Sequence, residues 1–255
     1  MITKEYYESK FNNSNIINGF FTKYVGLTKN TNSLDAHNAK SQIIKIQKDI
    51  YVAQKKIKLD KSKLKIINQI HSNKVIMINK RNFSNNFYGD GMITKDKNIS
   101  LAILTADCCP IFIFDKDSSF ICCLHSGWKG CYHNIIEVAL TKIKKIQSDL
   151  SKIYAVIGPC LHQKNFETDN TFKKKFISKN PFYKKFFINI KDSQKSLFDM
   201  KGLIKYQLKI NKIKNIEDLD IDTYINTKIF YSHRRSTHDN TLPTGRMVNI
   251  IGFAP

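Results

Sequence analysis

Three short apolar runs in the middle of the chain constrain the fold more than any other feature. They cover residues 101–104, 111–114 and 120–124. Uninterrupted apolar runs of this length, bounded by polar residues, are typical of buried strands. Because the polar residues 115–118 separate the last two runs, we expect those two to form a hairpin.

The remaining segments alternate between helical and extended patterns. Helical spacing of apolar residues predicts helices at 39–57, 132–146, 172–177 and 203–210. Extended segments are expected at 66–78 (interrupted at 69–73), 153–157, 229–232 and 247–253. Strands that alternate with single helices predict an α+β fold built in layers. With no internal repeat and no linker composition, we expect one domain spanning residues 1–255.

The chain is strongly basic, with 42 Lys+Arg against 21 Asp+Glu and a formal net charge of +21. Such an excess is common in proteins that bind nucleic acids, but those proteins rely on the planar fork of arginine. Here only Arg81, Arg234, Arg235 and Arg246 are arginines, and lysine supplies the rest. Lysine, isoleucine and asparagine share A- and T-rich codons, so we attribute most of the charge to composition and expect no specific nucleic-acid partner.

Several observations bear on where the protein works. No stretch approaches the roughly 18 apolar residues that span a bilayer, so we expect no membrane association. The first eight residues carry two acids and no apolar core, unlike a signal peptide. The cysteines at 108, 109, 122, 123, 131 and 160 include two adjacent pairs and are interpreted as reduced. A cytoplasmic location is the expectation.

Reactive side chains follow three of the predicted extended segments. His71 lies in the interruption at 69–73, Cys108 lies between two apolar runs, and His125 ends the next run. Three protein ligands with one open position are typical of a catalytic zinc site. The same residues allow a metal-free alternative, in which Cys108, beside Asp107, is a thiolate nucleophile with His125 as its base.

A second polar cluster lies near the end of the chain. Arg234 and Arg235 follow Tyr231-Ser232-His233, and Arg246 follows Thr244-Gly245. Arginines in a lysine-dominated chain suggest bidentate recognition of an anion, although surface ion pairs would explain them equally well. Farther upstream, Gly158-Pro159 indicates a sharp turn, for which we expect Cys160 to be structural; Glu167 could line a site or build the turn.

Taken in order, the motifs resemble those of the YfiH/laccase-domain (polyphenol oxidase-like) family over residues 18–253. They are Gln69-Ile70-His71, Asp90-Gly91-Met92-Ile93-Thr94, Thr105-Ala106-Asp107-Cys108-Cys109-Pro110, His125-Ser126-Gly127-Trp128-Lys129-Gly130, Ile157-Gly158-Pro159, Tyr231-Ser232-His233-Arg234-Arg235 and Thr244-Gly245-Arg246-Met247. Members have been described as copper oxidases, purine nucleoside phosphorylases and peptidoglycan-editing factors. The name of the family therefore does not decide the activity.

The resemblance implies an α/β/β/α layered domain with mixed sheets flanked by helices. It implies a zinc site formed by His71, Cys108 and His125, with copper as the alternative metal. The implied activity is phosphorolysis of adenosine, inosine, guanosine and methylthioadenosine, together with deamination of adenosine. Purine nucleosides and inorganic phosphate are then the partners, and the protein is expected to be a monomer or a small homo-oligomer.

Roles for the other residues follow as hypotheses. Asp107 or Glu167 would carry the proton in deamination. The phosphate would be held by basic side chains, for which the candidates are Lys129, Arg234, Arg235 and Arg246. The main alternative is an amidase that edits peptidoglycan precursors. A copper-dependent polyphenol oxidase and a basic RNA-binding protein fit less well, because seven histidines are too few for a multicopper enzyme and no RNA-binding motif is present.

The chain also departs from the family pattern. Ser126 and Lys129 replace the usual Ala and Arg of the His-Ala-Gly-Trp-Arg-Gly motif, and Asp222-Thr223 stands where a Cys-Thr pair is usual. The early Ser-Leu-Asn motif is Ser33-Leu34-Asp35, and Gln47-Lys48 occupies the place of an Asn-Arg element. The departures in the N-terminal third concern the N-terminal wall of the expected pocket, where the substrate would be selected.

Overall fold

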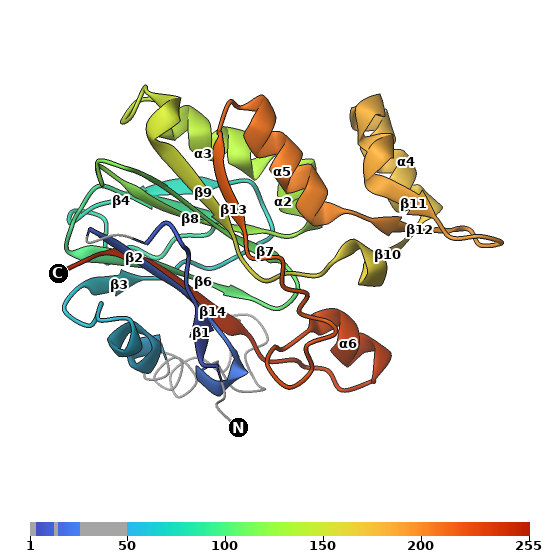
Figure 1. Ribbon diagram of the computed structural model, residues 1–255, viewed down its shortest axis with the longest axis horizontal. Helices are drawn as coiled ribbons and strands as arrows, with labels where there is room; N and C mark the ends of the chain where they lie inside the picture. Colours follow the sequence, from blue (N-terminus) through green and yellow to red (C-terminus); the bar gives the residue numbers. More distant parts are fainter. Residues whose placement is uncertain (1–3, 13–14, 26–49) are drawn as a thin grey trace.

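The computed structural model describes residues 4–12, 15–25 and 50–255 (Figure 1). Residues 50–56 are helical, which confirms the C-terminal part of the helix expected at 39–57. The rest of that segment lies outside the described residues, as do Ser33-Leu34-Asp35 and Gln47-Lys48.

Two mixed sheets form the centre of the described structure. The first has the order β1-β2-β14-β6-β3, with bounds Tyr6–Tyr7, Ile16–Phe21, Met247–Phe253, Ile99–Thr105 and Lys63–Lys65. The second has the order β13-β9-β7-β8-β5-β4, with bounds Asn215–Asp218, Ile153–Ile157, Cys109–Asp115, Ile121–Ser126, Gly91–Thr94 and Val75–Ile78. Each sheet contains parallel and antiparallel pairs, so neither is a simple parallel βαβ series.

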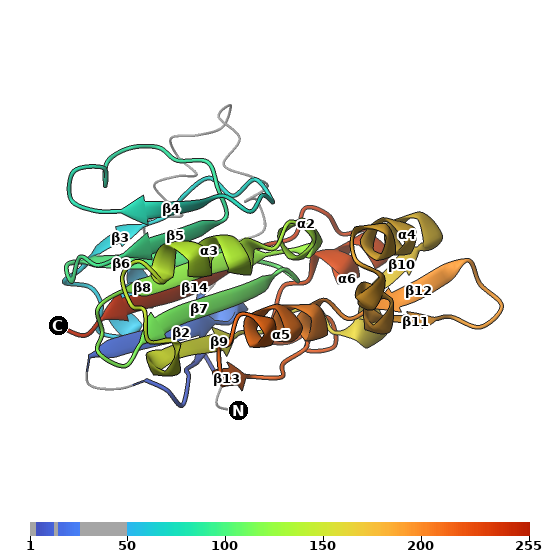
Figure 2. The same ribbon diagram turned by 90° about the horizontal axis from the view of Figure 1, so that it is seen from above.

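The two sheets pack face to face, and helices cover their outer faces. Phe20 of β2 stacks on Phe112 of β7 between the sheets, with ring centroids 4.5 Å apart. The helical residues 50–56 pack on the outer face of the first sheet. The outer face of the second sheet is covered by α3 (Ile135–Ile143) and α5 (Met200–Ile210), as Figures 1 and 2 show. The resulting α/β/β/α order confirms the predicted layered α+β fold.

Strand β7 shows why its sequence is apolar without alternation. Ile111 and Ile113 face the helices, whereas Phe112 and Phe114 face the other sheet. Because successive side chains of a strand point to opposite faces, both sets must be apolar when both faces are buried. The predicted hairpin is confirmed, since β7 pairs with β8 in antiparallel register from Cys109 opposite Ser126 to Phe114 opposite Ile121.

A smaller sheet extends the fold at one end. It has the order β10-β12-β11, with bounds Glu167–Asp169, Lys195–Phe198 and Phe187–Asn189. Helix α4 (Asn170–Lys179) packs on it through Phe172 and Phe176, which contact Phe187 and Phe198. Figure 2 shows this lobe beside α2 (Trp128–Tyr132), with α6 (His233–His238) nearby. The short 3₁₀ helices are Lys23–Val25, Leu150–Lys152, Gln163–Asn165 and Pro181–Phe186.

Three segments differ from the sequence prediction. The helix expected at 132–146 is shorter in the structure, where α3 begins only at Ile135 because Asn134 adopts a left-handed conformation (φ 54°) and caps it. Within 66–78 only β4 is a strand, since the preceding residues form the loop that carries His71. The strand expected at 229–232 is wrong, because Ser232 instead caps α6 by accepting a hydrogen bond from the Arg235 amide.

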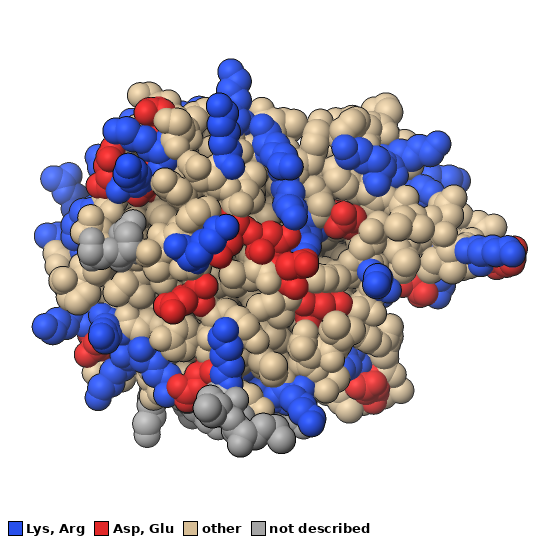
Figure 3. Space-filling view, in the orientation of Figure 1, with Lys and Arg blue, Asp and Glu red and all other residues tan. Residues whose placement is uncertain are grey.

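The charged residues are distributed without one continuous basic surface on the face shown in Figure 3. Lys and Arg side chains are scattered across that face, and Asp and Glu side chains gather near its middle. This distribution agrees with a compositional origin for most of the net charge. Among the described residues, no helix combines the length and the apolar character needed to cross a bilayer.

We expect the packing between the sheets to dominate stability. Replacing Phe112, which is fully buried, by Ala should lower the free energy of unfolding by about 3–5 kcal/mol, because it leaves a cavity against Phe20. Urea denaturation followed by circular dichroism measures the change. Phe182→Ala is the matched control, since Phe182 is 43% exposed and should cost far less. Equal losses would contradict this account of the core.

Candidate metal centre

The segment 106–108 crosses from one sheet to the other. Strand β6 of the first sheet ends at Thr105, and β7 of the second begins at Cys109. Asp107 takes up the left-handed region (φ 77°), and its carbonyl accepts a hydrogen bond from the Leu161 amide at 3.0 Å. This sharp turn places Cys108 at the ends of two strands, β7 and β8, that belong to the same sheet.

The crossing brings together the three residues that the sequence predicts as ligands. One ligand atom from each of His71, Cys108 and His125 lies within 4.8 Å of the others. Cys108 Sγ is 3.9 Å from His71 Nε2, and the two imidazole rings have centroids 4.8 Å apart. His125 is buried, Cys108 is half-buried and His71 is exposed, so one side of the group is open to solvent.

A buried carboxylate, Asp90, holds the two histidines in place. Its Oδ1 accepts a hydrogen bond from the His71 amide at 3.0 Å and lies 2.8 Å from His125 Nδ1. Its Oδ2 accepts from the amide and the hydroxyl of Ser72. The carboxylate thereby stabilises the left-handed conformation of His71 (φ 57°) and leaves Nε2 of His125 to face the group.

Gly127 has to be glycine because of the cysteine. A Cβ atom at this position would lie 2.8 Å from Cys108 Sγ and 3.4 Å from His71 Cδ2. The thiol therefore packs directly against the backbone at the start of α2. This contact explains why a glycine follows His125 by two residues and precedes Trp128.

The electrostatics of the group favour a thiolate. Burial opposes the charged form, but the neighbouring His125 and His71 lower the pKa of Cys108 to about 6. Conversely, Cys108 and Asp90 raise the pKa of His125 to about 9 against the effect of its burial. Burial alone would raise the pKa of Asp90, yet its hydrogen bonds to His125 and Ser72 lower it. The lowered pKa favours the thiolate of Cys108, which is the form that acts as a metal ligand or a nucleophile.

The donor set fits zinc. Catalytic zinc sites use three protein ligands drawn from His, Cys and carboxylates, and in tetrahedral geometry two of the ligand atoms are about 3.3–3.6 Å apart. The three ligand atoms here lie within 4.8 Å of one another, so side-chain rotations that bring them about 1 Å closer would complete the site. His71, Cys108 and His125 would hold the ion, and Asp90 would orient His125 as outer partners of zinc-bound histidines do.

The Asp107 carboxylate holds the C-terminal segment in place. Its Oδ1 accepts from Thr223 Oγ1 at 2.7 Å, and its Oδ2 accepts from Ser232 Oγ at 3.0 Å and from the Arg234 amide at 2.6 Å. The predicted catalytic residue thus lies beside the metal ligand, with both oxygens engaged. Its role in proton transfer stays a prediction.

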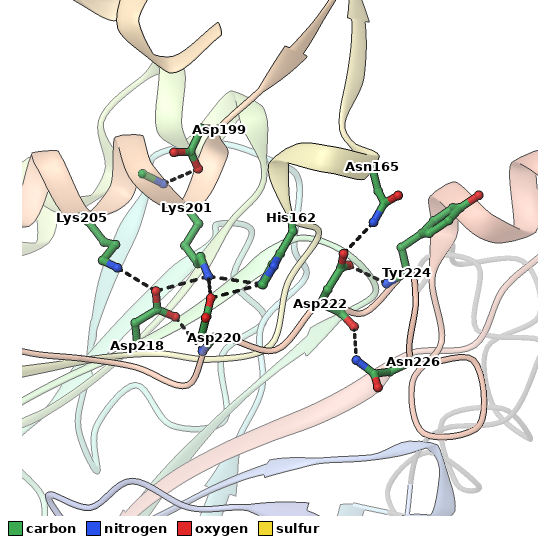
Figure 4. Close-up of polar contacts among 11 residues, drawn as sticks. His162, Asn165, Asp199, Lys201, Lys205, Asp218, Asp220, Asp222, Tyr224 and Asn226 are labelled. Atoms are coloured by element: carbon green, nitrogen blue, oxygen red, sulfur yellow. Dashed lines mark hydrogen bonds and ion pairs between the residues drawn. The ribbon is translucent and has the colours of Figure 1, made fainter. Parts of the chain in front are cut away.

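The segment that carries Thr223 is anchored by a polar network (Figure 4). Lys201 of α5 contacts Asp218, Asp220 and His162. Asp222 accepts from Asn165 Nδ2 at 2.6 Å and from the Tyr224 amide at 2.9 Å. Asp222 is 5% exposed. Its hydrogen bonds hold the adjacent Thr223 in the position from which Thr223 donates to Asp107.

The three C-terminal arginines, predicted to hold an anion, differ in their surroundings. Arg235 donates to the carbonyls of Thr223, Tyr224 and Phe230, so its guanidinium fastens the 223–230 loop. Arg234 Nη1 donates to the Glu167 carbonyl, and its guanidinium lies over the Phe166 ring. Arg246 Nη1 donates to two carbonyls of its own turn, and its charge interacts with Cys108 and Asp107. Of the three, Arg246 is electrostatically coupled to the cluster.

The two remaining predicted site residues are exposed. Glu167 forms an ion pair with Lys195 at 2.7 Å, and this hydrogen bond lowers the pKa of Glu167. Lys129 lies on α2, with its ammonium 5.6 Å from the centre of the Trp128 ring. Glu167 is not part of the His/Cys/His group. Lys129 is closer to the group in sequence, since it lies two residues after Gly127, which packs on Cys108.

The sequence profile of the family described as multi-copper polyphenol oxidoreductase laccase matches residues 18–254. The chain belongs to this family. Among similar proteins, one from Rickettsia prowazekii named purine nucleoside phosphorylase is 35% identical over 173 residues, which are 68% of this chain and 71% of that protein. One from Campylobacter jejuni with the same designation is 34% identical over 194 residues, covering 75% and 78% of the two chains.

Solved structures share the fold. A Neisseria meningitidis protein superposes with a TM-score of 0.82 at 20% identity, covering 99% of this chain and all of that one. YfiH from Bacillus licheniformis gives a TM-score of 0.79 at 24% identity, covering 96% and 98%. The resemblance to the YfiH/laccase-domain family, inferred from the motifs, is confirmed.

Sequence reasoning missed the residues that position the ligands. Asp90 was placed in the Asp90-Gly91-Met92-Ile93-Thr94 motif without a role, because its partners His71, Ser72 and His125 are distant from it in the sequence. Thr223 and Ser232 were not assigned, and no local pattern distinguishes them, because both act on Asp107 over more than 100 residues of sequence.

Replacing Asp90 by Asn should lower the affinity for zinc by about 10–100-fold, because His125 and the His71 loop lose their charged acceptor. Competition with a chromophoric chelator measures the affinity. Asp115→Asn is the matched control, since Asp115 is equally buried and accepts from Ser119 at the β7–β8 turn. Unchanged zinc binding in Asp90→Asn would show that the carboxylate does not orient the ligands.

The lowered pKa of Cys108 predicts its alkylation profile. In metal-free protein, the rate with iodoacetamide should rise through pH 6 and level off above pH 7, because the thiolate predominates above its pKa. His125→Asn should move the midpoint toward pH 9, the usual range of a thiol. The label is located by peptide mass analysis, and bound zinc should block it. A midpoint near pH 9 in the native sequence would contradict the proposed electrostatics.

Proposed function

We propose that the protein is a zinc-dependent purine nucleoside phosphorylase that cleaves adenosine, inosine, guanosine and methylthioadenosine with phosphate and also deaminates adenosine. The observation that carries the proposal is the His71/Cys108/His125 group, which offers three ligands and opens to solvent. The curated relatives named purine nucleoside phosphorylase support the choice of substrate.

Zinc rather than copper is the proposed metal. A zinc ion held by three protein ligands supplies a Lewis acid with one open coordination position. The thiolate of Cys108 and two neutral imidazoles suit that ion, and Asp90 fixes the imidazole of His125 by its hydrogen bond at Nδ1. Elemental analysis should therefore find about one zinc per chain.

The residues around the cluster have separable tasks in this proposal. Arg246, whose charge interacts with Cys108 and Asp107, would stabilise negative charge that develops at the site. Asp107 or Glu167 would carry the proton. Asp107 adjoins Cys108 but already accepts three hydrogen bonds, whereas Glu167 is paired with exposed Lys195. Arg235 keeps the loop in place through three backbone carbonyls and contributes by positioning.

Incubation with adenosine tests the proposal. With phosphate present, we expect adenine and ribose 1-phosphate; without phosphate, we expect slow formation of inosine. Chromatography of the products distinguishes the two reactions. Neither product, from a protein that contains its metal, would refute the nucleoside proposal and favour an amidase acting on peptidoglycan precursors.

Cysteine variants supply the control. Cys108→Ala should lose both zinc and activity, because it removes a ligand. Cys122→Ala should keep both, since Cys122 is buried in β8 on the face toward the helices. Zinc retained at full stoichiometry in Cys108→Ala would exclude this cysteine from the ligand set.

A further inference from the structure

A group of lysines lies over two aromatic rings beside the metal centre. Lys175 Nζ is 5.2 Å from the centre of the Trp128 ring and 4.9 Å from that of Tyr132. Lys179 Nζ is 4.4 Å from the Tyr132 ring, and Lys129 Nζ is 5.6 Å from the Trp128 ring. Helices α2 and α4 therefore share a cationic surface, and Figure 2 shows them next to one another.

Aromatic contacts fix the spacing of the two helices. Trp128 meets Phe172 edge to face with centroids 5.2 Å apart, and Tyr132 meets Phe176 in the same way at 5.2 Å. Lys179 also donates a hydrogen bond to the Tyr132 carbonyl at the end of α2. The lysines are therefore carried by a rigid base, with their flexible stems resting on ring faces.

No ion pair to a described acidic side chain is formed by this surface. Within the described ranges, Lys129, Lys175 and Lys179 form no ion pair with Asp or Glu, unlike Lys195 or Lys201. Their charges converge on His133, whose pKa is lowered by its burial and then by Lys179, Lys175 and Lys129. Three cations that repel one another around a single imidazole produce a positive potential that an anion would relieve.

Two segments connect the surface to the metal centre. The Asn73 side chain, two residues after the ligand His71, donates to the His133 carbonyl at 3.0 Å. Trp128 directly follows Gly127, on which Cys108 Sγ packs. A ligand held by the lysines would thus lie at the rim of the His/Cys/His group, bounded by the His71 loop and α4.

We propose that Lys129, His133, Lys175 and Lys179 form a phosphate-binding site at the rim of the metal centre. Lysine ammonium groups bind phosphate oxygens as point charges, and three of them match a dianion. The choice of phosphate as the anion rests on the proposed function. The site takes either inorganic phosphate or the phosphate group of a nucleoside monophosphate. Only Lys129 belongs to the phosphate-binding residues predicted from the sequence.

The single tryptophan of the chain makes the site directly observable. Because Trp128 lies under Lys129 and Lys175, its fluorescence should respond to an anion bound there. The purified full-length protein is titrated with inorganic phosphate, with adenosine 5′-monophosphate and with sodium chloride at matched ionic strength. We expect a saturable change with both phosphates and none with chloride. The phosphate that saturates at the lower concentration identifies the natural source.

Charge-removing variants locate the binding. The double variant Lys175→Gln/Lys179→Gln should raise the dissociation constant about tenfold or more, while urea unfolding stays unchanged. Lys174→Gln is the matched control, because Lys174 is exposed on the same helix but contacts neither ring. An unchanged dissociation constant in the double variant, an equal loss in the control, or a response that follows ionic strength alone would each overturn the proposal.

The outcome is separable from that of the nucleoside assay. Phosphate binding that depends on Lys175 and Lys179, in a protein that does not cleave nucleosides, would support this site and refute the proposed function. Binding of an RNA homopolymer at least about a hundredfold tighter than either phosphate would instead assign the surface to nucleic acid and overturn the proposal.

Discussion

The arrangement of the candidate site depends on one buried carboxylate. Asp90 lies just before β5, has no exposed surface, and accepts hydrogen bonds from three backbone amides and a hydroxyl while it contacts an imidazole. Burying a charged group costs free energy unless it is paired and hydrogen-bonded. Moving any of these partners away from Asp90 would therefore be unfavourable, and this keeps them in place. The loop at 70–72 and the end of β8 are thereby fixed relative to one another, although they are separated by about fifty residues of sequence.

The second constraint is the change of sheet at 106–108. Strand β6 pairs with β14, while β7 pairs with β8 and β9, so the connecting residues must turn sharply between two packed layers. Asp107 uses its carboxylate to gather Thr223, Ser232 and Arg234 on the other side of this turn. One short crossing therefore positions both the thiol of Cys108 and the C-terminal segment that contacts Asp107.

The sequence predicted the parts that depend on local pattern. The apolar runs at 111–114 and 120–124 predicted the hairpin, and the residues at their ends predicted the His/Cys/His group. It could not predict the acceptors of Arg235, because backbone carbonyls of a distant loop leave no trace in residue type. The false strand at 229–232 has the same origin, since the cap made by Ser232 outweighs the apolar character of Ile229 and Phe230.

The two-faced burial of β7 has a consequence for how this chain can vary in length. Ile111 and Ile113 pack in the core between the sheet and the helices, and Phe112 and Phe114 pack in the core between the two sheets. Cys108 directly precedes this strand. Deleting one residue within 109–115 would exchange the contents of the two cores and rotate the thiol away from His71. An insertion or deletion in this strand would therefore disrupt both the packing of the two cores and the position of the Cys108 thiol. A single substitution there would disrupt only the packing of one core.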